Sequence, residues 1–323
     1  MENYFLLTIC KPQLYAYFCS VKISGKYWIL LLILSLIWGS SFILMKKGMY
    51  ASSGEMIFNS NQVATMRILL SSLVLLPFGI RAFKRVCLKK HFVPFIVVAL
   101  CGNLFPAFLF TYAETGISSG FTGMLNSITP IFVIFIGFGF FKIRMTYSQI
   151  LGSIIGSLGV ISLLYFGKSV SLDGDWEHIF AVVLATLCYA ISLSVIRYKL
   201  SSYKSIDIAA IAFLLLLPPS LTIFMTEQTW SVFESKENAW NSFIAISILG
   251  IIGTAFALFL FNNIIKNTSA LFASSVTYFI PIVAVFIGFF FGERISAYQI
   301  ISMLMVLLGV FVANSKRDKK VFD

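Results

Sequence analysis

The sequence predicts an all-α, polytopic membrane protein of ten transmembrane helices, arranged as two inverted five-helix repeats. Three observations lead to this fold class. Hydrophobic residues make up 59% of the 323 residues and charged residues only 11%, and the mean hydropathy is +0.93, so there is too little polar surface for a globule in water. Apolar runs of about 20 residues, long enough to cross about 30 Å of hydrocarbon, recur along the chain. Finally, the stretch 118–160 returns almost whole as 269–310.

The repeat extends over most of both halves. At a separation of 151 residues, identical pairs include Ser41 and Ser192, Gly102 and Gly253, Ser118 and Ser269, Pro130 and Pro281, and Gly137 and Gly288. Because each half contains an odd number of predicted crossings, the second copy must enter the membrane from the opposite side. Inverted repeats of this kind are a common skeleton of secondary transporters.

Ten hydrophobic segments have the length of a membrane span. In chain order they are 27–45, 63–80, 92–112, 119–141, 147–166, 176–196, 206–226, 243–263, 269–291 and 297–314. We expect all ten to be helices, because irregular backbone or an open strand edge facing lipid would leave amide groups without hydrogen bonds.

The distribution of charge predicts the orientation. Lysines and arginines concentrate on alternate loops, such as 81–90 and 197–204, while the opposite loops carry acidic residues. By the positive-inside rule, both termini are expected in the cytoplasm. The predicted organisation is a cytoplasmic tail 1–26, a first five-helix repeat 27–166, an outer linker 167–175, a second repeat 176–314 and a basic cytoplasmic tail 315–323.

Composition also bears on partners. The net charge is +11, but the basic residues are spread over loops and form no single face, so nucleic acid is not an expected partner. The five cysteines make no CxxC pair and no metal-like cluster with His91 or His178, and we expect no metal, no cofactor and no catalytic residue. An integral membrane enzyme acting on lipid is the alternative, and it would depend on one of these two histidines.

Helices four and nine contain the strongest sequence signals for a site. Pro130 and Gly137 interrupt the first, and Pro281 and Gly288 interrupt the second at matching depth. A proline removes an amide donor and leaves a carbonyl free, which can kink a helix and expose backbone to a cavity. Matching breaks in two inverted copies predict helix breaks or gates at a midplane site; close helix packing by glycine is the alternative.

Several polar and aromatic residues lie inside predicted spans. We predict that they contact the substrate: Trp38, Asn103, Tyr112, Asn126, Tyr189, Thr277 and Tyr278. A cavity for small organic solutes needs apolar walls and a few hydrogen-bonding groups. For each residue alone, a structural hydrogen bond or a core aromatic contact is the competing interpretation.

Two charged residues belong to, or border, the predicted spans. Arg67 lies within the second helix, where a charge is costly and often functional; a structural role, snorkelling to the interface and anion recognition all remain open. Glu114 ends the third helix. We expect it to be exposed to solvent in a short loop, with pairing to Arg67 or proton uptake as alternatives.

Three stretches resemble a known family. They are "LSLIWGSSFILMKKG" in the first helix, "ATMRILLSSLVLLPF" in the second, and "PIVAVFIGFFFGERISAYQIISMLMVLLGV" in the last two. In combination they are similar to the EamA family of the drug/metabolite transporter superfamily, over nearly the whole chain past Lys26. The first repeat departs from this pattern: Phe141, Lys142 and Ile143 precede Arg144 where Gly-Glu-Arg would stand.

The resemblance implies a secondary transporter of small organic metabolites, such as amino acids, with a central cavity between the repeats. We expect it to work by efflux and alternating access, with protons as a candidate coupling ion. The expected setting is a bacterial inner membrane, with the lipid bilayer and a small-molecule substrate as partners. Ten helices can close a cavity within a single chain, so a monomer and a homodimer are both compatible.

Overall fold

The computed structural model describes residues 24–143, 145–167, 176–268, 273 and 276–315. Within these ranges the chain consists mainly of helices and turns, with an isolated bridge between Tyr50 and Met56. The predicted cytoplasmic tails and the outer linker fall largely outside the described residues.

The first half of the chain supplies eight α-helices and one π-helical segment. They are α2 (Gly25–Gly39), α3 (Ser41–Met49), α4 (Ser60–Phe83), α5 (Leu88–Ala99), η1 (Leu100–Leu104), α6 (Phe105–Ala113), α7 (Ser119–Asn126), α8 (Thr129–Gly139) and α9 (Tyr147–Gly167). Several of the apolar spans are each divided into two or three consecutive helical segments.

The second half has a similar order. Its helices are α10 (Trp176–Lys199), α11 (Ser205–Thr226), α12 (Thr229–Ser235), α13 (Ala239–Ser247), η2 (Ile248–Phe256), α14 (Ala257–Asn267), α16 (Val276–Phe290) and α17 (Ala297–Ser315). The short helix α12 lies in a loop that the sequence analysis left without structure.

Eight helices of the described part are long and apolar enough to cross a membrane, and the two shorter apolar helices Val276–Phe290 and Ala297–Ala313 follow them. Their positions agree with the ten predicted segments to within a few residues at most ends. The structure adds breaks that hydropathy does not show. The first span is broken at Ser40, and the fourth at Ser127 and Ile128, just before Pro130.

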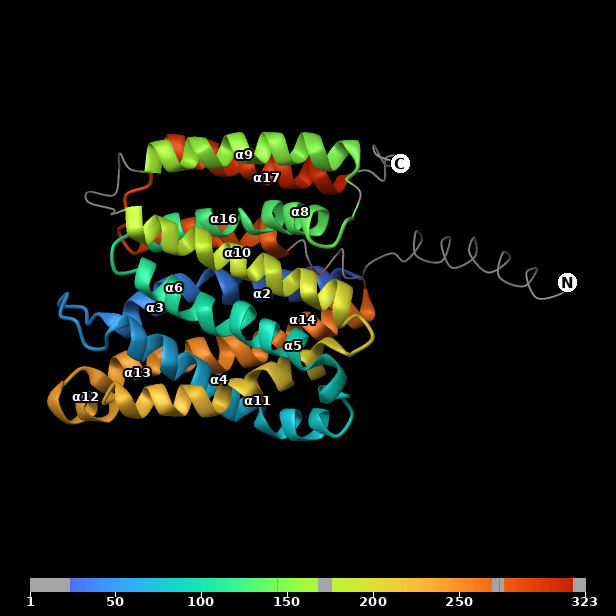
Figure 1. Ribbon diagram of the computed structural model, residues 1–323. Helices are drawn as coiled ribbons and strands as arrows, with labels where there is room; N and C mark the ends of the chain where they lie inside the picture. The colour runs from blue at the N-terminus through green and yellow to red at the C-terminus, as the bar shows by residue number, and fades with distance from the viewer. Residues whose placement is uncertain (1–23, 144, 168–175, 269–272, 274–275, 316–323) are drawn as a thin grey trace, which may run out of the picture.

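The helices pack in layers, as Figure 1 shows. Helices α9 and α17 lie side by side along one edge of the bundle, and α4 and α11 lie side by side along the other. Between these pairs, α2 packs against α16, and α10 packs against α8. Each half therefore places its first span against the fourth span of the other half.

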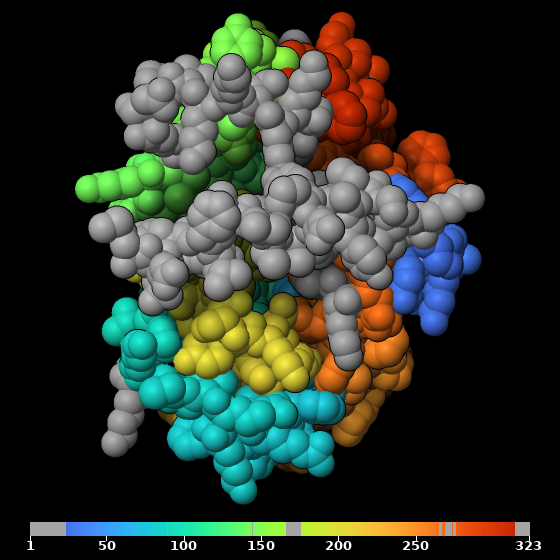
Figure 2. Space-filling view, turned by 90° about the vertical axis from the view of Figure 1, so that its right-hand side faces the viewer, coloured from blue at the N-terminus to red at the C-terminus, as the bar shows by residue number. Residues whose placement is uncertain are grey.

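Ion pairs join the halves at both ends of the bundle. At the end that carries the turns 84–87 and 200–204, Arg85 contacts Asp207 at 2.5 Å, and the Tyr203 hydroxyl lies 2.9 Å from His91. Figure 2 views the bundle from this end, with the segment around the start of α5 in cyan beside the turn between α10 and α11 in yellow. At the opposite end, Lys236 pairs with Glu55.

Glycines set the distance between α9 and α17. A Cβ atom on Gly309 would lie 2.4 Å from the amide nitrogen of Gly156 and 2.6 Å from the carbonyl oxygen of Gly152. These neighbours are backbone atoms, which cannot rotate away. The pair of glycines in α9 thus has a packing role, because it lets two helices approach closely in a membrane.

Gly309→Ala is therefore expected to destabilise the bundle by about 1–3 kcal/mol, the usual cost of overpacking. The thermal unfolding midpoint of the purified protein should fall by several degrees. Gly139→Ala is the matched control, because a Cβ atom there meets nothing within 4 Å. Equal midpoints for the two variants would contradict this account of the α9–α17 contact.

Candidate functional site

Two aromatic pairs join the halves in the interior of the bundle. Trp38 of α2 contacts Phe261 of α14, with ring centroids 5.4 Å apart. Tyr189 of α10 contacts Phe110 of α6, with centroids 5.7 Å apart. Trp38 and Tyr189 occupy the same repeat position, as do Phe110 and Phe261. Each half thus supplies one ring to each pair.

The π-helical segments lie at matching positions in the third and eighth spans. In η1, the Asn103 side chain donates to the Val98 carbonyl at 3.2 Å; in η2, the Thr254 hydroxyl donates to the Leu249 carbonyl at 3.2 Å. Both bonds reach the carbonyl five residues earlier. Wide turns of this type recur at functional sites. The polar side chains here satisfy the backbone that the wide turn disturbs, so Asn103 has at least a structural role.

Arg67 points into the bundle from α4. It lies seven residues after the start of the helix, or about 10 Å at 1.5 Å per residue. Its Nε donates to the Thr254 hydroxyl at 3.3 Å, its Nη1 lies 3.9 Å from the Met45 sulfur, and its charge acts on the Tyr189 hydroxyl. A charge at the centre of a span costs about 2.5–3.5 kcal/mol on insertion scales, and Arg67, closer to one end, has contacts with neutral groups.

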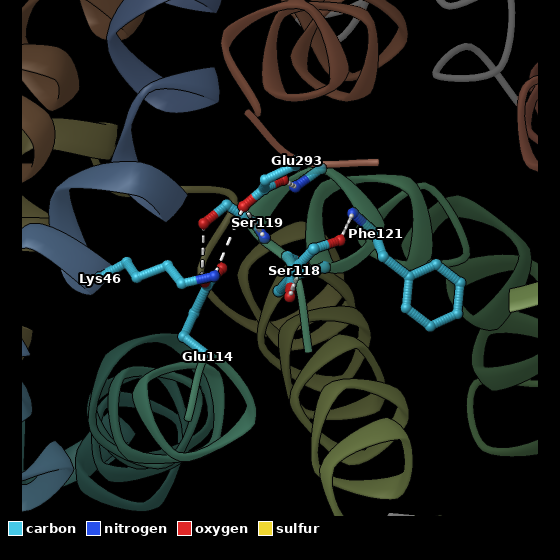
Figure 3. A network of polar contacts seen from close by, with 8 residues as sticks. Lys46, Glu114, Ser118, Ser119, Phe121 and Glu293 are labelled. Atoms are coloured by element: carbon cyan, nitrogen blue, oxygen red, sulfur yellow. Dashed lines mark hydrogen bonds and ion pairs between the residues drawn. The ribbon is translucent and has the colours of Figure 1, made fainter. Parts of the chain in front are cut away.

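At one end of the bundle, Glu293 closes over the start of α7. Its two carboxylate oxygens accept hydrogen bonds from the amide groups of Ser119 at 2.8 Å and Gly120 at 2.7 Å. Lys46 of α3 lies 3.7 Å from the same carboxylate. Figure 3 shows the three elements converging. We call this arrangement the Glu293 latch: a carboxylate of the second half bound to a helix N-terminus of the first half, where negative charge is favourable.

Glu114 lies directly beside the latch, one residue beyond the apolar span Lys90–Ala113. Its exposed fraction is 1%, so the expectation of solvent exposure is wrong. The reason is tertiary: Oε2 accepts a hydrogen bond from the Ser119 hydroxyl at 2.7 Å, and Oε1 is buried without a partner. Burial raises the pKa of Glu114 to about 8, with Ser119 and Lys46 opposing the shift and Glu293 adding to it.

A pocket of about 350 Å³ opens beside the latch. Lys46, Glu293 and Arg294 contribute its charged side chains, and Ser118, Gln299 and residues 291–292 complete its lining. A small polar solute would meet these groups at this end of the bundle.

The remaining predicted residues are spread over the interior and the same end. Asn126 ends α7, and its Oδ1 atom is buried without a partner. The Tyr112 hydroxyl donates to Glu177 at 3.1 Å, and its ring stacks on His178 at 4.8 Å. Thr277 belongs to α16. The Tyr278 hydroxyl donates to the Val310 carbonyl in α17, within an apolar cluster separate from the aromatic pairs.

The predicted helix breaks have distinct surroundings. Pro130 lies in the first turn of α8, directly after the break in the fourth span, and Pro281 lies inside α16. A Cβ atom on Gly288 would lie 2.3 Å from Glu293 Oε2, so this glycine makes room for the latch. A Cβ atom on Gly137 would meet the Tyr198 hydroxyl at 3.6 Å, which is an ordinary van der Waals contact.

Sequence reasoning did not single out Glu293, Lys46 or Thr254 as site residues. Glu293 belongs to the Gly-Glu-Arg motif, which was the available signal, but its partners lie more than 170 residues away in sequence. Among the described residues, no group of three or more His, Cys, Asp or Glu side chains could hold a metal ion.

Known proteins share this sequence pattern and fold. The chain is 24% identical over 281 residues to the uncharacterized transporter YoaV of Bacillus subtilis, covering 86% of this chain and 93% of that protein. It is 23% identical over 304 residues to protein PagO of Salmonella typhimurium, covering 91% and 94%. A crystal structure of a protein superposes with a TM-score of 0.55 at 14% identity, covering 90% of this chain and 96% of the other.

The family comparison matches both halves. The model of the EamA-like transporter family aligns with residues 25–165 and again with residues 176–315. These two matches span most of the chain and leave out the loop between α9 and α10. The many apolar helices fit a multi-pass membrane protein. The chain therefore belongs to the EamA-like transporter family and is a multi-pass membrane transporter.

Proposed function

We propose that this chain is a secondary transporter that exports small organic metabolites by alternating access between two inverted five-helix repeats. The proposed arrangement has ten spans in a bacterial inner membrane, with both termini in the cytoplasm. The Glu293 latch then lies at the outer end and the Arg85–Asp207 pair at the cytoplasmic end.

The observation that carries this proposal is the reciprocal aromatic contact between the halves. Trp38 meets Phe261, and the repeat-related Tyr189 meets Phe110. Ser41 and Ser192 behave alike: Gly253 faces Ser41, and Gly102 faces Ser192. Such exchange of contacts is what a twofold axis between the halves produces. Two halves that can trade conformations supply an inward and an outward opening from one sequence pattern.

The outer latch has no equivalent carboxylate at the other end. Gly292 has a φ of 81° and Lys142 a φ of 52°. These two left-handed residues follow helices α16 and α8 in equivalent places. Glu293 comes next in the second repeat, whereas the uncharged Ile143 comes next in the first. The proposed outer end is therefore held by a carboxylate bound to a helix N-terminus, whereas the inner end is joined by the Arg85–Asp207 ion pair.

Glu114 is the proposed proton-binding group. It faces Lys46 of α3 and Glu293 from the loop after α16, and it bonds to Ser119 at the start of α7. Its neutral form suits the buried, closed outer end. Opening that end would hydrate the carboxyl group and release its proton, which links the proton to the state of the latch.

Counterflow in liposomes tests the transport proposal. Vesicles preloaded with an unlabelled amino acid, nucleoside or sugar should accumulate the labelled form transiently and saturably, because a carrier exchanges solutes through one alternating site. A pore would equilibrate the label without an overshoot. Folded, reconstituted protein that shows no counterflow with any solute class would sink the proposal.

The latch predicts a change in accessibility. In a cysteine-free background carrying Thr122→Cys, a buried position just beneath Glu114, Glu293→Gln should speed labelling by an impermeant maleimide from outside. We expect roughly a tenfold increase, since a hydrogen bond to a charged group contributes about 1.5–3 kcal/mol.

Glu55→Gln is the matched control for that experiment. It removes a partly exposed ion pair between the halves at the same end, the Glu55–Lys236 pair, and exposed pairs contribute little. Labelling in Glu293→Gln that is no faster than in Glu55→Gln would show that the latch does not hold this end closed.

The raised pKa of Glu114 predicts how stability depends on pH. Because the folded state holds this proton up to about pH 8 and the unfolded state releases it near 4.5, stability from this group falls as pH rises between those values and then levels off. The thermal unfolding midpoint of Glu114→Gln, measured relative to that of the wild type at the same pH, should therefore rise from pH 5 to pH 8.

Glu177→Gln provides the comparison, since Glu177 is an exposed carboxylate bonded to Tyr112 at the same end. A constant difference between Glu114→Gln and wild type across this range would exclude Glu114 as the titrating group.

A further inference from the structure

Arg67 is a cation without a carboxylate partner among the described residues. Its contacts are the Thr254 hydroxyl, the Met45 sulfur and the Tyr189 hydroxyl. A guanidinium has five N–H donors in a planar fork, and these neutral groups leave several of them unused. A partly buried cation without a counter-ion is unfavourable unless something else supplies the negative charge.

Neither nearby carboxylate fills that role. Glu293 is bound to the start of α7 and to Lys46. The charges that act on Glu114 are those of Lys46 and Glu293. Pairing between Arg67 and Glu114, one of the possibilities raised by the sequence, is thus absent from the described contacts. Snorkelling does not describe Arg67 either, since its contacts lead inward to α3, α10 and η2.

The surroundings of Arg67 come from both halves. The Tyr189 ring, which bears the hydroxyl near Arg67, packs on Phe110, and Phe110 packs on Phe42 with centroids 5.8 Å apart. The π-helical turn η2 brings Thr254 to the guanidinium. The position therefore combines a cation, two hydroxyl groups and an aromatic wall at the boundary between the halves.

The second repeat has no such charge. The corresponding helix of the second half, α11, contains no lysine or arginine. Arg67 is a departure from the pseudo-symmetry, which is what an asymmetric solute requires of its site.

We propose that Arg67 binds the carboxylate of the transported solute. The guanidinium would hold the two oxygens side by side, the Tyr189 hydroxyl would donate a further hydrogen bond, and the Tyr189, Phe110 and Phe42 rings would receive an apolar portion of the solute. This inference rests on the proposed function and narrows its substrates to small organic carboxylates.

The test compares acids with their primary amides, which have a similar shape but lack the negative charge of the carboxylate. The purified full-length chain in lipid nanodiscs is titrated with phenylacetate, hexanoate and L-leucine, each against its amide, and ligand-induced thermal stabilisation is measured. At least one acid should stabilise the wild type while its amide does not. Arg67→Gln should weaken that binding by about 10- to 100-fold, as expected for losing hydrogen bonds to a charged group.

Lys47→Gln is the matched control. This change removes a different cation, Lys47 of α3. The Lys47 ammonium group lies over the Phe291 ring, 4.2 Å from its centroid, and outside the surroundings of Arg67. The variant should retain the wild-type response, and Arg67→Lys should retain part of it. Arg67→Gln that unfolds at the wild-type temperature without ligand shows that the loss concerns binding.

Three outcomes overturn the proposal: no stabilisation by any of the three acids, equal stabilisation by acid and amide, or an unchanged response in Arg67→Gln. Counterflow measured in parallel separates this from the proposed function. Counterflow of neutral or cationic solutes only, unchanged in Arg67→Gln, would reject the carboxylate site and leave the transporter standing. Absence of counterflow with every solute would reject the transporter itself.

Discussion

The structure depends on one constraint of the bilayer: a backbone amide or carbonyl that loses its helical partner finds no water to replace it. Each break in a span is repaired by a polar side chain. Asn103 and Thr254 bond to the carbonyls disturbed by the two π-helical turns. Glu293 bonds to the free amides at the start of α7. Ser127 and Thr129 bond to carbonyls at the break before α8. These polar side chains therefore satisfy backbone groups that the breaks leave without helical partners.

This constraint explains what the sequence could predict. A span needs a long apolar run, so hydropathy finds α9, expected at 147–166 and observed at Tyr147–Gly167. Pro130 marks the break in the fourth span because proline lacks an amide hydrogen. The π-helical turns have no comparable signature beyond a glycine in each copy. Hydropathy does not predict α12, because this helix is too short to span a membrane. It is held in place by Phe233, whose ring packs against the rings of Phe58 and Trp240.

The site was harder to predict because its contacts join residues far apart in sequence. From the sequence, Glu114 is predicted to be an exposed loop residue. Its carboxyl group is buried because α7 and Glu293 pack against it. Arg67 raised three possibilities from sequence alone; its contacts with Thr254 and Met45 argue against snorkelling, and anion recognition stays a proposal. By contrast, the pairing of Trp38 with Tyr189 as equivalent positions was visible in the repeat, because matched aromatic residues at matched depth reflect a shared architecture.

The two copies share a skeleton but differ in chemistry. The aromatic pairs and the π-helical hydrogen bonds occur twice, whereas the Glu293 carboxylate and the Arg67 charge each occur once: Ile143 takes the place of Glu293 in the first half, and α11 contains no basic residue. Two identical halves would close their two ends with equal free energy. The two ends instead have different charged contacts, the Glu293 latch at one end and the Arg85–Asp207 pair at the other, and a difference of 1.4 kcal/mol between two closed states already shifts the population tenfold. The departures from the repeat therefore give the two ends of the bundle different chemistry.

Helix α3 connects the interior to the latch. Its neighbouring residues Met45 and Lys46 contact Arg67 and Glu293 respectively. The helix is separated from α2 by the break at Ser40, where Gly39 allows α16 to approach so closely that a Cβ atom would lie 2.5 Å from Val283. A short helix with a break at one end can tilt without bending a whole span. Because one turn of α3 touches both charged groups, a displacement that draws Met45 toward an occupied Arg67 also moves Lys46 relative to Glu293. Under the proposed function, packing through α3 is the contact by which a solute at Arg67 and the Glu293 latch would act on each other.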